Sequence, residues 1–364
     1  MILTQFKNYT HQAFSFHPGF NLVYGTNGSG KTNVLDAIHY LALGKSHFVP
    51  QDKFSILQGE SFFRIEGLFK QEEETVQWVL KFQPGTKRLE KDGKAYGRMQ
   101  DHIGEVGLVM IAPDDLDLID GQSQARRKFI DLTLSQSDHI YLGHLATYKR
   151  LLDQRNALLK SSPSPDLGFL QALNEKMTEP AHRIYSIRKK FVLDFLPLFY
   201  KYYHAISKAK ENVEIRFQSD LDQADLLTLF NQGWTQDLYA QYTVRGCHKD
   251  DLVFLKDGEP LKYLGSQGQK KTFLVSLFLA QSDYLSKTMD SPPIILLDDI
   301  FDKLDDERIR YLLHTIGNMS TRQVIITDTG KERLSAVLKD LGAQVHFIHI
   351  RDGLVNTPLH DETT

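Results

Sequence analysis

The chain has 364 residues, a net charge of −3, and a composition that is 41% hydrophobic and 24% charged, which excludes a disordered protein and is typical of a globular one with two or three domains. No run approaches the roughly 18 to 20 apolar residues that span a bilayer, and the N-terminus lacks a signal-peptide pattern. Because the single cysteine, Cys247, excludes an internal disulfide, we expect a reducing, cytoplasmic setting without a membrane partner.

The N-terminal third of the chain is predicted to form mainly strands with one helix. The strand-forming segments are short runs of apolar or β-branched residues, at 20–24, 61–69, 75–82 and 107–113. Apolar residues at helical spacing begin after Lys31, and Gly44 is a plausible stop. A turn at Asp92-Gly93 follows the strands at 61–69 and 75–82 in the sequence, and this order favours an antiparallel meander.

The middle of the chain has a helical pattern. Apolar residues three and four positions apart predict one helix over 126–160 and a second over 170–208, separated by the S-S-P-S-P segment at 161–165. Two helices joined by such a break predict an antiparallel hairpin arm. Pro180 and Pro197 should kink or interrupt the second helix.

The last third alternates between helix and strand. Strands are predicted at 213–217 and 251–255, followed by a helix after Gln269, a strand at 294–297, a helix at 308–316 and a strand at 323–327. This order is typical of a parallel sheet in an α/β protein. We therefore expect a discontinuous ATP-binding head domain, 1–120 and 242–364, with an inserted helical domain at 121–241.

A glycine-rich segment, G-T-N-G-S-G-K-T at Gly25–Thr32, lies between the first strand of this α/β pattern and its helix. The glycines allow backbone N–H groups to approach phosphate oxygens at the positive end of the helix. Lys31 would reach the β- and γ-phosphates, and the Thr32 hydroxyl would ligate Mg²⁺. The strand–loop–helix context favours ATP binding over a chance match in a glycine-rich turn. The predicted nucleotide contacts are Gly25, Thr26, Asn27, Gly28, Ser29, Gly30, Lys31, Thr32 and Asn33.

A second motif is the apolar strand that ends in two aspartates, I-I-L-L-D-D at 294–299. Asp298 would hold a water molecule on Mg²⁺, and Asp299 would orient or deprotonate the attacking water. Alone, the pattern favours a buried strand followed by a solvated acidic turn. The glycine loop in the same chain favours the catalytic interpretation, with Lys31, Asp298 and Asp299 as the catalytic residues.

A third motif, G-S-Q-G-Q at 265–269, opens an apolar helix. Ser266, Gly268 and Gln269 would lie at its positive end, which is a potential anion site. By itself the motif fits an ordinary N-cap serine followed by a flexible turn.

Together the three motifs resemble the ABC-type ATPases, in which the signature serine of one subunit closes over ATP held by another subunit. The resemblance implies that Ser266, Gly268 and Gln269 contact a partner's nucleotide, and that Asp305 belongs to the D-loop at 302–305. Lys31 and Ser266 are 235 residues apart. This spacing exceeds that of transporter subunits, and the short helical insertion excludes the long coiled coil of an SMC protein.

Several segments, in the family's order, also resemble the RecF family of bacterial DNA replication and repair proteins over nearly the whole chain. They are G-F-N-L-V-Y-G-T-N-G-S-G-K-T-N-V-L-D-A-I at 19–38, A-P-D-D-L-D-L-I-D-G at 112–121, R-R-K-F-I-D at 126–131, R-G-C-H-K-D-D-L at 245–252, G-S-Q-G-Q-K-K-T at 265–272 and I-L-L-D-D-I-F-D-K-L-D at 295–305. The chain departs from the family at Cys247, Lys249 and Asp302-Lys303, where the family usually has Pro, Arg and Ser-Glu.

The resemblance implies an α/β fold: an ABC/SMC-like ATPase head, with a P-loop mixed sheet and an antiparallel β meander, and an inserted helical arm. It also implies an ATP-dependent homodimer on duplex and gapped DNA that works with RecR and RecO to load RecA. We expect a weak, DNA-stimulated ATPase, since Asp299 is shorter than the glutamate more common at its position. The alternatives are an ATP-gated DNA-binding scaffold with negligible hydrolysis, and a transporter ATPase subunit.

Positive charge is concentrated in residues 141–210, which carry 12 Lys or Arg and 5 Asp or Glu. A basic arm on an otherwise acidic chain is typical of binding to a phosphate backbone, and a solvated helix face is the alternative. The candidate DNA contacts are Lys149, Arg150, Arg183, Arg188, Lys189 and Lys190.

Four further positions have open roles. Arg126 and Arg127 could contact nucleotide, DNA or a partner head. His248 is expected to brace the head rather than to serve catalysis. Thr327-Asp328 stands where transporter-type relatives keep a switch histidine, and the role of Asp328 is left open.

Overall fold

The computed structural model describes residues 1–71, 74–161, 165–208, 211–301, 306–319, 323–351 and 353–356. The chain forms two compact units: the first unit comprises Met1–Asp114 with Gln281–Thr364, and the second unit comprises Asp115–Ala280. Compactness alone does not define a domain. The predicted division into 1–120 with 242–364 and 121–241 therefore remains a proposal beside it.

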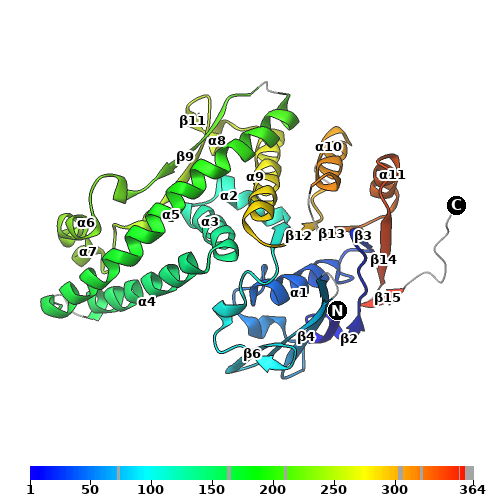
Figure 1. The fold of residues 1–364 in the computed structure, drawn as a ribbon, viewed down its shortest axis with the longest axis horizontal. Helices are drawn as coiled ribbons and strands as arrows, with labels where there is room; N and C mark the ends of the chain where they lie inside the picture. Colours follow the sequence, from blue (N-terminus) through cyan, green and yellow to red (C-terminus); the bar gives the residue numbers. More distant parts are fainter. Residues whose placement is uncertain are drawn as a thin grey trace. The chain divides into compact units, whose positions relative to one another are not determined.

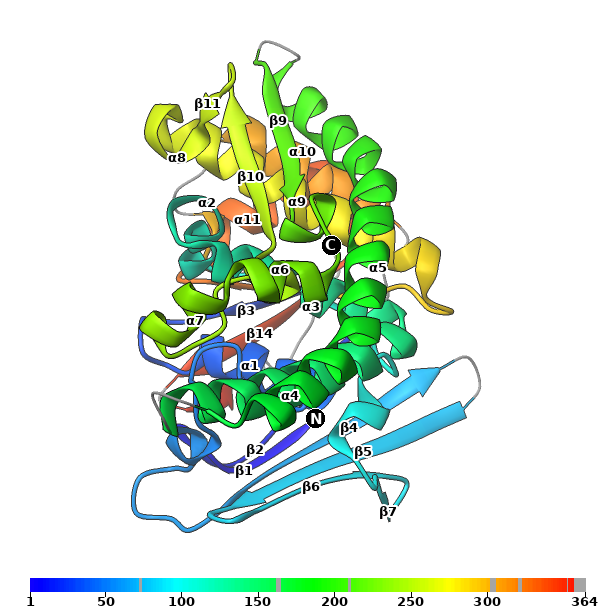
Figure 2. The ribbon, with the colours of Figure 1, turned by 90° about the vertical axis from the view of Figure 1, so that its left-hand side faces the viewer.

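A six-stranded sheet forms the centre of the first unit, in the order β15-β14-β3-β13-β12-β8 (Figures 1 and 2). Its strands are β3 (Gly19–Tyr24), β8 (Leu108–Ile111), β12 (Ile294–Asp298), β13 (Gln323–Asp328), β14 (Val345–Arg351) and β15 (Leu354–Asn356). All neighbouring pairs are parallel except β14 with β15. Every residue of β12 is buried, as is usual for a parallel strand covered on both faces. The predicted parallel sheet is confirmed.

A second six-stranded sheet in the first unit has the order β2-β1-β4-β5-β6-β7, and all its pairs are antiparallel. Its strands are β1 (Ile2–Phe6), β2 (Tyr9–Ala13), β4 (Phe63–Gln71), β5 (Glu74–Gln83), β6 (Thr86–Lys91) and β7 (Lys94–Ala95). Asp92 and Gly93 join β6 to β7 with φ of 49° and 77°, the signs that a tight two-residue hairpin requires. This confirms the predicted meander.

Helix α1 (Lys31–Leu43) contacts strands of both sheets in the first unit. Gly44 ends it in the left-handed conformation, with φ 69°, as the sequence predicted. Helices α10 (Asp306–Gly317) and α11 (Glu332–Asp340) lie on the opposite side of the parallel sheet (Figures 1 and 2). Covering both faces of the parallel strands buries their apolar side chains and fixes the edge at which those strands end.

The second unit is built around helices α3 (Ser123–Ser137), α4 (His139–Ser161) and α5 (Leu167–Ser207). The predicted single helix over 126–160 is therefore wrong, because the chain becomes extended at Asp138, with φ −145° and ψ 100°. The Asp138 carboxylate accepts the Tyr141 N–H at 2.9 Å, which caps the new helix.

Helices α4 and α5 lie side by side as the predicted antiparallel arm (Figures 1 and 2). α5 continues for 41 residues through both Pro180 and Pro197, so the predicted interruption is wrong. Each proline removes one backbone hydrogen bond. The long apolar face that α5 buries, including Phe191, Phe195 and Phe199, offsets that loss.

The remainder of the second unit is a small antiparallel sheet with short helices. Its elements are α2 (Asp117–Asp120), β9 (Val213–Gln218), α6 (Leu226–Gln232), α7 (Trp234–Ala240), β10 (Asp251–Lys256), β11 (Glu259–Pro260) and α8 (Leu261–Leu264). Helix α9 (Gln267–Thr288) begins in this unit and continues past its last residue, Ala280. Among the described residues, none of the helices has the length and apolarity needed to cross a bilayer.

Candidate nucleotide site

The glycine-rich loop connects β3 to α1 at the carboxyl edge of the parallel sheet. Gly25 and Gly30 have φ of 154° and 112°. A Cβ atom at Gly25 would lie 2.1 Å from the Ile350 carbonyl oxygen, and one at Gly30 would lie 2.5 Å from the Tyr9 hydroxyl. Both positions therefore require glycine, because the loop backbone passes against a strand and a tyrosine.

The loop encloses the Lys31 side chain. The Lys31 ammonium is buried and donates to the carbonyl oxygens of Gly25, at 2.8 Å, and Thr26, at 3.0 Å. The Ser29 hydroxyl is buried and has no hydrogen-bond partner in the part of the chain that the structure describes, whereas Thr26, Asn27 and Gly28 are exposed. A buried hydroxyl that lacks a partner is uncommon, and a phosphate oxygen would satisfy it. The loop therefore fits the polyphosphate of a nucleotide.

Two threonine hydroxyls converge on Asp298 at the end of β12. Thr32 Oγ1, in the first turn of α1, donates to both Asp298 carboxylate oxygens at 3.0 and 3.1 Å. Thr327 Oγ1 of β13 donates to Asp298 Oδ1 at 2.8 Å. Burial and the adjacent Asp299 raise the pKa of Asp298, while the two hydroxyl donors and the Lys31 ammonium oppose that rise. A hydroxyl beside a carboxylate forms the oxygen donor set that Mg²⁺ prefers.

Asp299 follows this carboxylate at the edge of the sheet. It is half-buried, and its φ of 48° places it in the left-handed region, which is unfavourable for a residue with a side chain. Its N–H donates to Thr327 Oγ1 at 3.0 Å. Asp299 thus occupies a defined backbone conformation next to Asp298, and Lys31, Thr32 and both aspartates belong to one site in the first unit.

Residues at the turn between β1 and β2 also hold the glycine-rich loop in place. The sequence did not predict this contact. Asn8 Nδ2 donates to the Ser29 carbonyl oxygen at 3.1 Å, and Asn33 Nδ2 donates to Asn8 Oδ1 at 2.7 Å. The buried Tyr9 hydroxyl donates to the Gly30 carbonyl oxygen at 2.9 Å. A short turn at Lys7 and Asn8 carries no phosphate-binding signal of its own, so only the fold identifies these residues.

The signature residues lie in the second unit, at the start of α9. The Ser266 N–H donates to Gln269 Oε1 at 2.9 Å, and the Gln269 N–H donates to Ser266 Oγ at 3.3 Å. This reciprocal pair is a capping box. Ser266 is exposed, and Gly268 is half-buried. The motif therefore presents a helix N-terminus to solvent, while Asp305 lies outside the described residues.

Most of the predicted DNA contacts lie on the surface of the arm. Lys149 and Arg150 are exposed on α4, and Arg183, Lys189 and Lys190 are exposed on α5. Lys189 pairs with Asp222 at 3.0 Å and donates to the Tyr185 hydroxyl at 2.8 Å, and Lys149 lies 3.6 Å from Asp131. These two lysines are partly neutralised, whereas the other three contribute more of the arm's positive surface.

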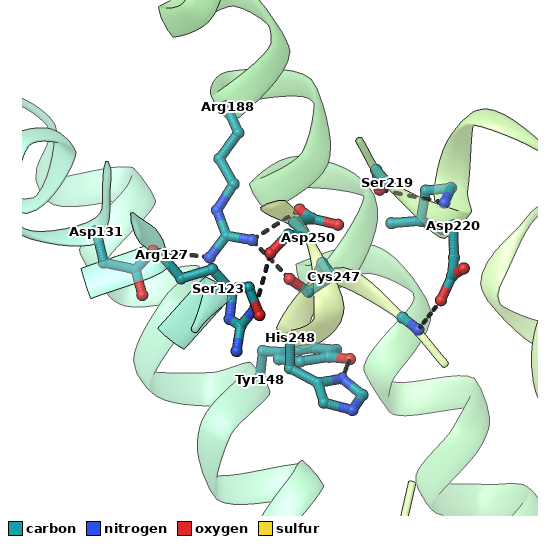
Figure 3. Close-up of polar contacts among 12 residues, drawn as sticks. Ser123, Arg127, Asp131, Tyr148, Arg188, Ser219, Asp220, Cys247, His248 and Asp250 are labelled. Carbon is teal, nitrogen blue, oxygen red and sulfur yellow. Dashed lines mark hydrogen bonds and ion pairs between the residues drawn. The ribbon is translucent and has the colours of Figure 1, made fainter. Parts of the chain in front are cut away.

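Arg188 is buried, so its prediction as a DNA contact is wrong; Figure 3 shows its polar contacts. Its guanidinium forms 2.7 Å ion pairs with Asp131 and Asp250 and donates to the Cys247 carbonyl oxygen at 2.6 Å. Burial raises the pKa of Asp250 to about 6 despite the nearby Arg188 charge. The helical spacing to Ile184 and Phe191 places Arg188 on the buried face of α5, a signal that a count of charges overlooks.

Arg126 and Arg127 brace the second unit. Arg126 makes a bidentate pair with Asp251, at 2.7 and 3.0 Å, and Arg127 donates to Ser123 Oγ at 2.7 Å and to the Asp250 carbonyl oxygen at 2.8 Å. These contacts lie within the second unit, and the three roles open for Arg126 and Arg127 stay predictions.

His248 has hydrogen-bond partners at both ring nitrogens, and Figure 3 shows the one with Tyr148. Nε2 lies 2.9 Å from the Thr243 carbonyl oxygen, so it is the donor, and Nδ1 accepts from the Tyr148 hydroxyl at 2.8 Å. Burial lowers the pKa of His248 to about 4, which keeps the ring neutral.

In the first unit, Asp328 is buried and accepts the Gly330 N–H at 3.1 Å.

A phosphate-type loop after β3, an aspartate at the end of β12, a second antiparallel sheet and a helical insertion define the head of an SMC-type ATPase. An Smc head bound to the C-winged helix domain of ScpA has the same fold, with a TM-score of 0.58 and 16% identity over 98% of this chain and 94% of that one. The model of the RecF/RecN/SMC N terminal domain matches residues 1–346.

Similar sequences show which family within this class of ATPase the chain resembles. A DNA replication and repair protein RecF from Flavobacterium johnsoniae is 42% identical, covering 93% of this chain and 95% of its own. One from Bacteroides fragilis is 36% identical, covering 97% and 96%. The solved recombination mediator protein RecF-ATP of the RecFOR pathway has a TM-score of 0.87 and 26% identity, covering 98% of this chain and 95% of that one. The chain belongs to the RecF family.

Proposed function

We propose that the chain is an ATP-dependent recombination mediator whose ATP, with Mg²⁺, gates its pairing on DNA. The observation that carries this proposal is the convergence of Lys31, Thr32 and Asp298 below an open glycine loop. The solved relative RecF-ATP, of the same fold, supports ATP as the nucleotide. The proposed cytoplasmic setting follows from the single cysteine and belongs to the same proposal.

Each residue of the site has a separate role in this proposal. With nucleotide bound, the Lys31 ammonium would hold the β- and γ-phosphates in place of the loop carbonyl oxygens, and Ser29 Oγ would donate to a phosphate oxygen. Thr32 Oγ1 and Asp298 would hold Mg²⁺, which neutralises charge on the phosphates. Asp299 would orient the attacking water. The Asn8 and Tyr9 contacts keep the loop open for the phosphates.

The ATP held by one subunit is proposed to be completed by a second copy of the chain. Ser266, Gly268 and Gln269 form an exposed, capped N-terminus of α9, and such a terminus attracts phosphate. The family resemblance assigns these residues, with Asp305, to the nucleotide of the partner. ATP binding would then control dimerisation, and hydrolysis would end it.

The surface of the arm is proposed to bind duplex DNA and gapped DNA. Arg150, Arg183 and Lys190 supply exposed positive charge without sequence-reading motifs, which favours contacts to phosphates over contacts to bases. The relative's place in the RecFOR pathway supports RecR and RecO as partners and loading of RecA as the outcome.

A second candidate is an ATP-gated DNA scaffold that hardly hydrolyses its nucleotide. The observation that favours it is Asp299, whose side chain reaches less far than glutamate would. Single-turnover hydrolysis with and without duplex DNA separates the two: stimulation by DNA that is lost in Asp299→Asn supports the ATPase. Hydrolysis that is unaffected by DNA or by the substitution supports the scaffold.

The proposal as a whole is tested by light scattering with and without ATP, beside a DNA titration at two salt concentrations. We expect a monomer without ATP, a dimer with ATP, and DNA affinity that increases with ATP and falls with salt. A monomer under both conditions would contradict ATP-gated pairing. DNA affinity independent of ATP would contradict gating of DNA binding.

A further inference from the structure

Thr327 lies at the centre of the nucleotide edge of the parallel sheet. β13 runs between β3 and β12, and its register places Thr327 opposite Asp298 on one side and Val23 on the other. The residue is completely buried. A buried hydroxyl at the end of the apolar run V-I-I-T needs hydrogen-bond partners. The partners of Thr327 are Asp298 and Asp299.

The direction of each hydrogen bond follows from the chemistry of the groups. The Asp299 N–H can only donate, so Thr327 Oγ1 accepts from it at 3.0 Å. The hydroxyl hydrogen must then point to an acceptor, and Asp298 Oδ1 at 2.8 Å is much nearer than the Leu297 carbonyl oxygen at 3.5 Å. One oxygen atom therefore bonds both to the carboxylate of Asp298 and to the backbone of Asp299.

These two bonds fix different things. The bond to Asp298 Oδ1 orients the carboxylate from the neighbouring strand β13, whereas the Thr32 hydroxyl reaches the same oxygen from α1. It remains available when Thr32 Oγ1 turns to a metal ion. The bond from the Asp299 N–H supports a left-handed backbone, with φ 48°, which a residue with a Cβ otherwise disfavours. The backbone conformation of Asp299 determines the direction in which its side chain leaves the chain, and therefore which positions its carboxylate can reach.

We propose that Thr327 is a positioning residue of the nucleotide site, which holds Asp298 for Mg²⁺ and Asp299 for the attacking water through a single hydroxyl. The inference rests on the proposed ATP function. It assigns no contact between Thr327 and nucleotide, metal or water. Residues that orient a metal ligand in this way change metal affinity by about 10- to 100-fold when removed.

Two substitutions test the role of the hydroxyl. Thr327→Val keeps the shape and burial but removes the hydroxyl, and Thr327→Ser keeps the hydroxyl. For each, titration with a fluorescent, slowly hydrolysed ATP analogue gives the affinity without Mg²⁺ and the Mg²⁺ concentration that half-maximally enhances binding. We expect Thr327→Val to raise that Mg²⁺ concentration about tenfold while the affinity in EDTA changes less than about twofold. Thr327→Ser should restore the wild-type Mg²⁺ dependence.

Single-turnover hydrolysis at saturating Mg²⁺ isolates the effect on Asp299. Thr327→Val should lower this rate at least about tenfold, the size expected when a proton-transfer group is displaced, and Thr327→Ser should recover it. Thr327→Ala gives a second variant without the hydroxyl if valine prevents folding. Equal Mg²⁺ dependence and equal rates for wild type and both hydroxyl-free variants would overturn the inference.

A buried threonine in the second unit provides a matched control. Thr133 is also completely buried, and its hydroxyl donates to the Phe129 carbonyl oxygen at 2.8 Å. Thr133→Val should lower the thermal midpoint as Thr327→Val does, yet leave the Mg²⁺ dependence unchanged. If Thr133→Val reproduces the Mg²⁺ effect, that effect is one of stability and the inference fails. If wild type does not bind the analogue at all, the proposed function fails instead.

Discussion

Thr32 and Asp298 are 266 residues apart in the sequence, yet the Thr32 hydroxyl donates to both carboxylate oxygens of Asp298, at 3.0 and 3.1 Å. In the same site, the Lys31 ammonium bonds to carbonyl oxygens of its own loop. The fold therefore joins residues from distant parts of the chain in one site, and hydrogen bonds within the chain hold the side chains of Lys31, Thr32 and Asp298.

The clearest test of the loop is Lys31→Ala. Charge-assisted hydrogen bonds contribute about 1.5 to 3 kcal/mol each, so ATP affinity should fall by at least about tenfold, and ATP-dependent dimerisation should be lost with it. Calorimetric titration with a slowly hydrolysed ATP analogue measures the affinity. Lys53→Ala, at an exposed lysine of the same unit, is the control. Retained dimerisation of Lys31→Ala with ATP would contradict the proposed role of the loop.

Ser266 serves as the N-cap of α9, and its proposed contact with a partner's phosphate can be separated from that role. Ser266→Asp keeps a capping side chain but places a negative charge where the γ-phosphate would lie. We expect normal ATP binding to the monomer and no ATP-dependent dimer in light scattering. Ser266→Asn, which caps without the charge, is the control. A Ser266→Asp variant that dimerises like wild type would show that Ser266 only caps.

Exposed arginine and lysine on the arm should account for the salt dependence of DNA binding. Replacing Arg150, Arg183 and Lys190 together by glutamine should weaken binding and reduce the log–log salt slope by about 0.9 for each duplex phosphate that the variant no longer neutralises. Lys189→Gln should have a smaller effect, because Asp222 already pairs with it. Fluorescence anisotropy at several salt concentrations measures the slope. An unchanged slope in the triple variant would move the DNA site away from the arm.

Arg188 should behave as a structural residue. Arg188→Gln would leave Asp131 and Asp250 without their buried partner, and breaking a buried ion pair costs about 3 to 5 kcal/mol. Urea unfolding should show this loss, while Lys189→Gln, one position away on the exposed face, should change the free energy of unfolding by less than about 0.5 kcal/mol. If Arg188→Gln is as stable as wild type, the buried network does not stabilise this unit.

His248 predicts a loss of stability in mild acid. Burial lowers its pKa to about 4, below the value of about 6.5 in an unfolded chain. The unfolded state therefore binds the extra proton first, and stability should fall by about 2 kcal/mol between pH 7 and pH 5. Because carboxylates also titrate in this range, the measurement is the difference from His248→Gln in urea unfolding at both pH values. An equal acid loss in the two proteins would contradict the prediction.

The sequence predicts best where chemistry and local geometry coincide. Pattern alone identifies the glycine loop, the strand ending in Asp298 and the Asp92-Gly93 hairpin. Each needs particular residue types at fixed positions, and such combinations are uncommon elsewhere in a chain. Pattern alone fails where packing decides. The Asp138 cap is a weak local signal within a run of apolar residues at helical spacing, and the packing that carries α5 through Pro180 involves the neighbouring helix α4.

The contacts within the site were harder to predict because they join distant segments. Asn8 reaches Ser29 and Asn33 from a turn, and Thr327 meets Asp298 through strand register. Both depend on sheet topology. Arg188 shows the opposite error, since its charge suggested exposure, whereas its position among apolar residues of α5 indicated burial.

The position of β3 has a consequence for biosynthesis. Its hydrogen-bonded neighbours, β13 and β14, lie near the end of the chain, and Asn21 donates to the Val324 carbonyl oxygen across 303 residues. During translation, the antiparallel sheet and the whole second unit leave the ribosome before either neighbour exists. Until then, the apolar residues Leu22 and Val23 of β3 lack their neighbouring strands, so they can aggregate or bind chaperones. A chain that ends before residue 323 lacks β13 and β14, so β3 has no strand neighbour and Asp298 lacks the Thr327 hydroxyl.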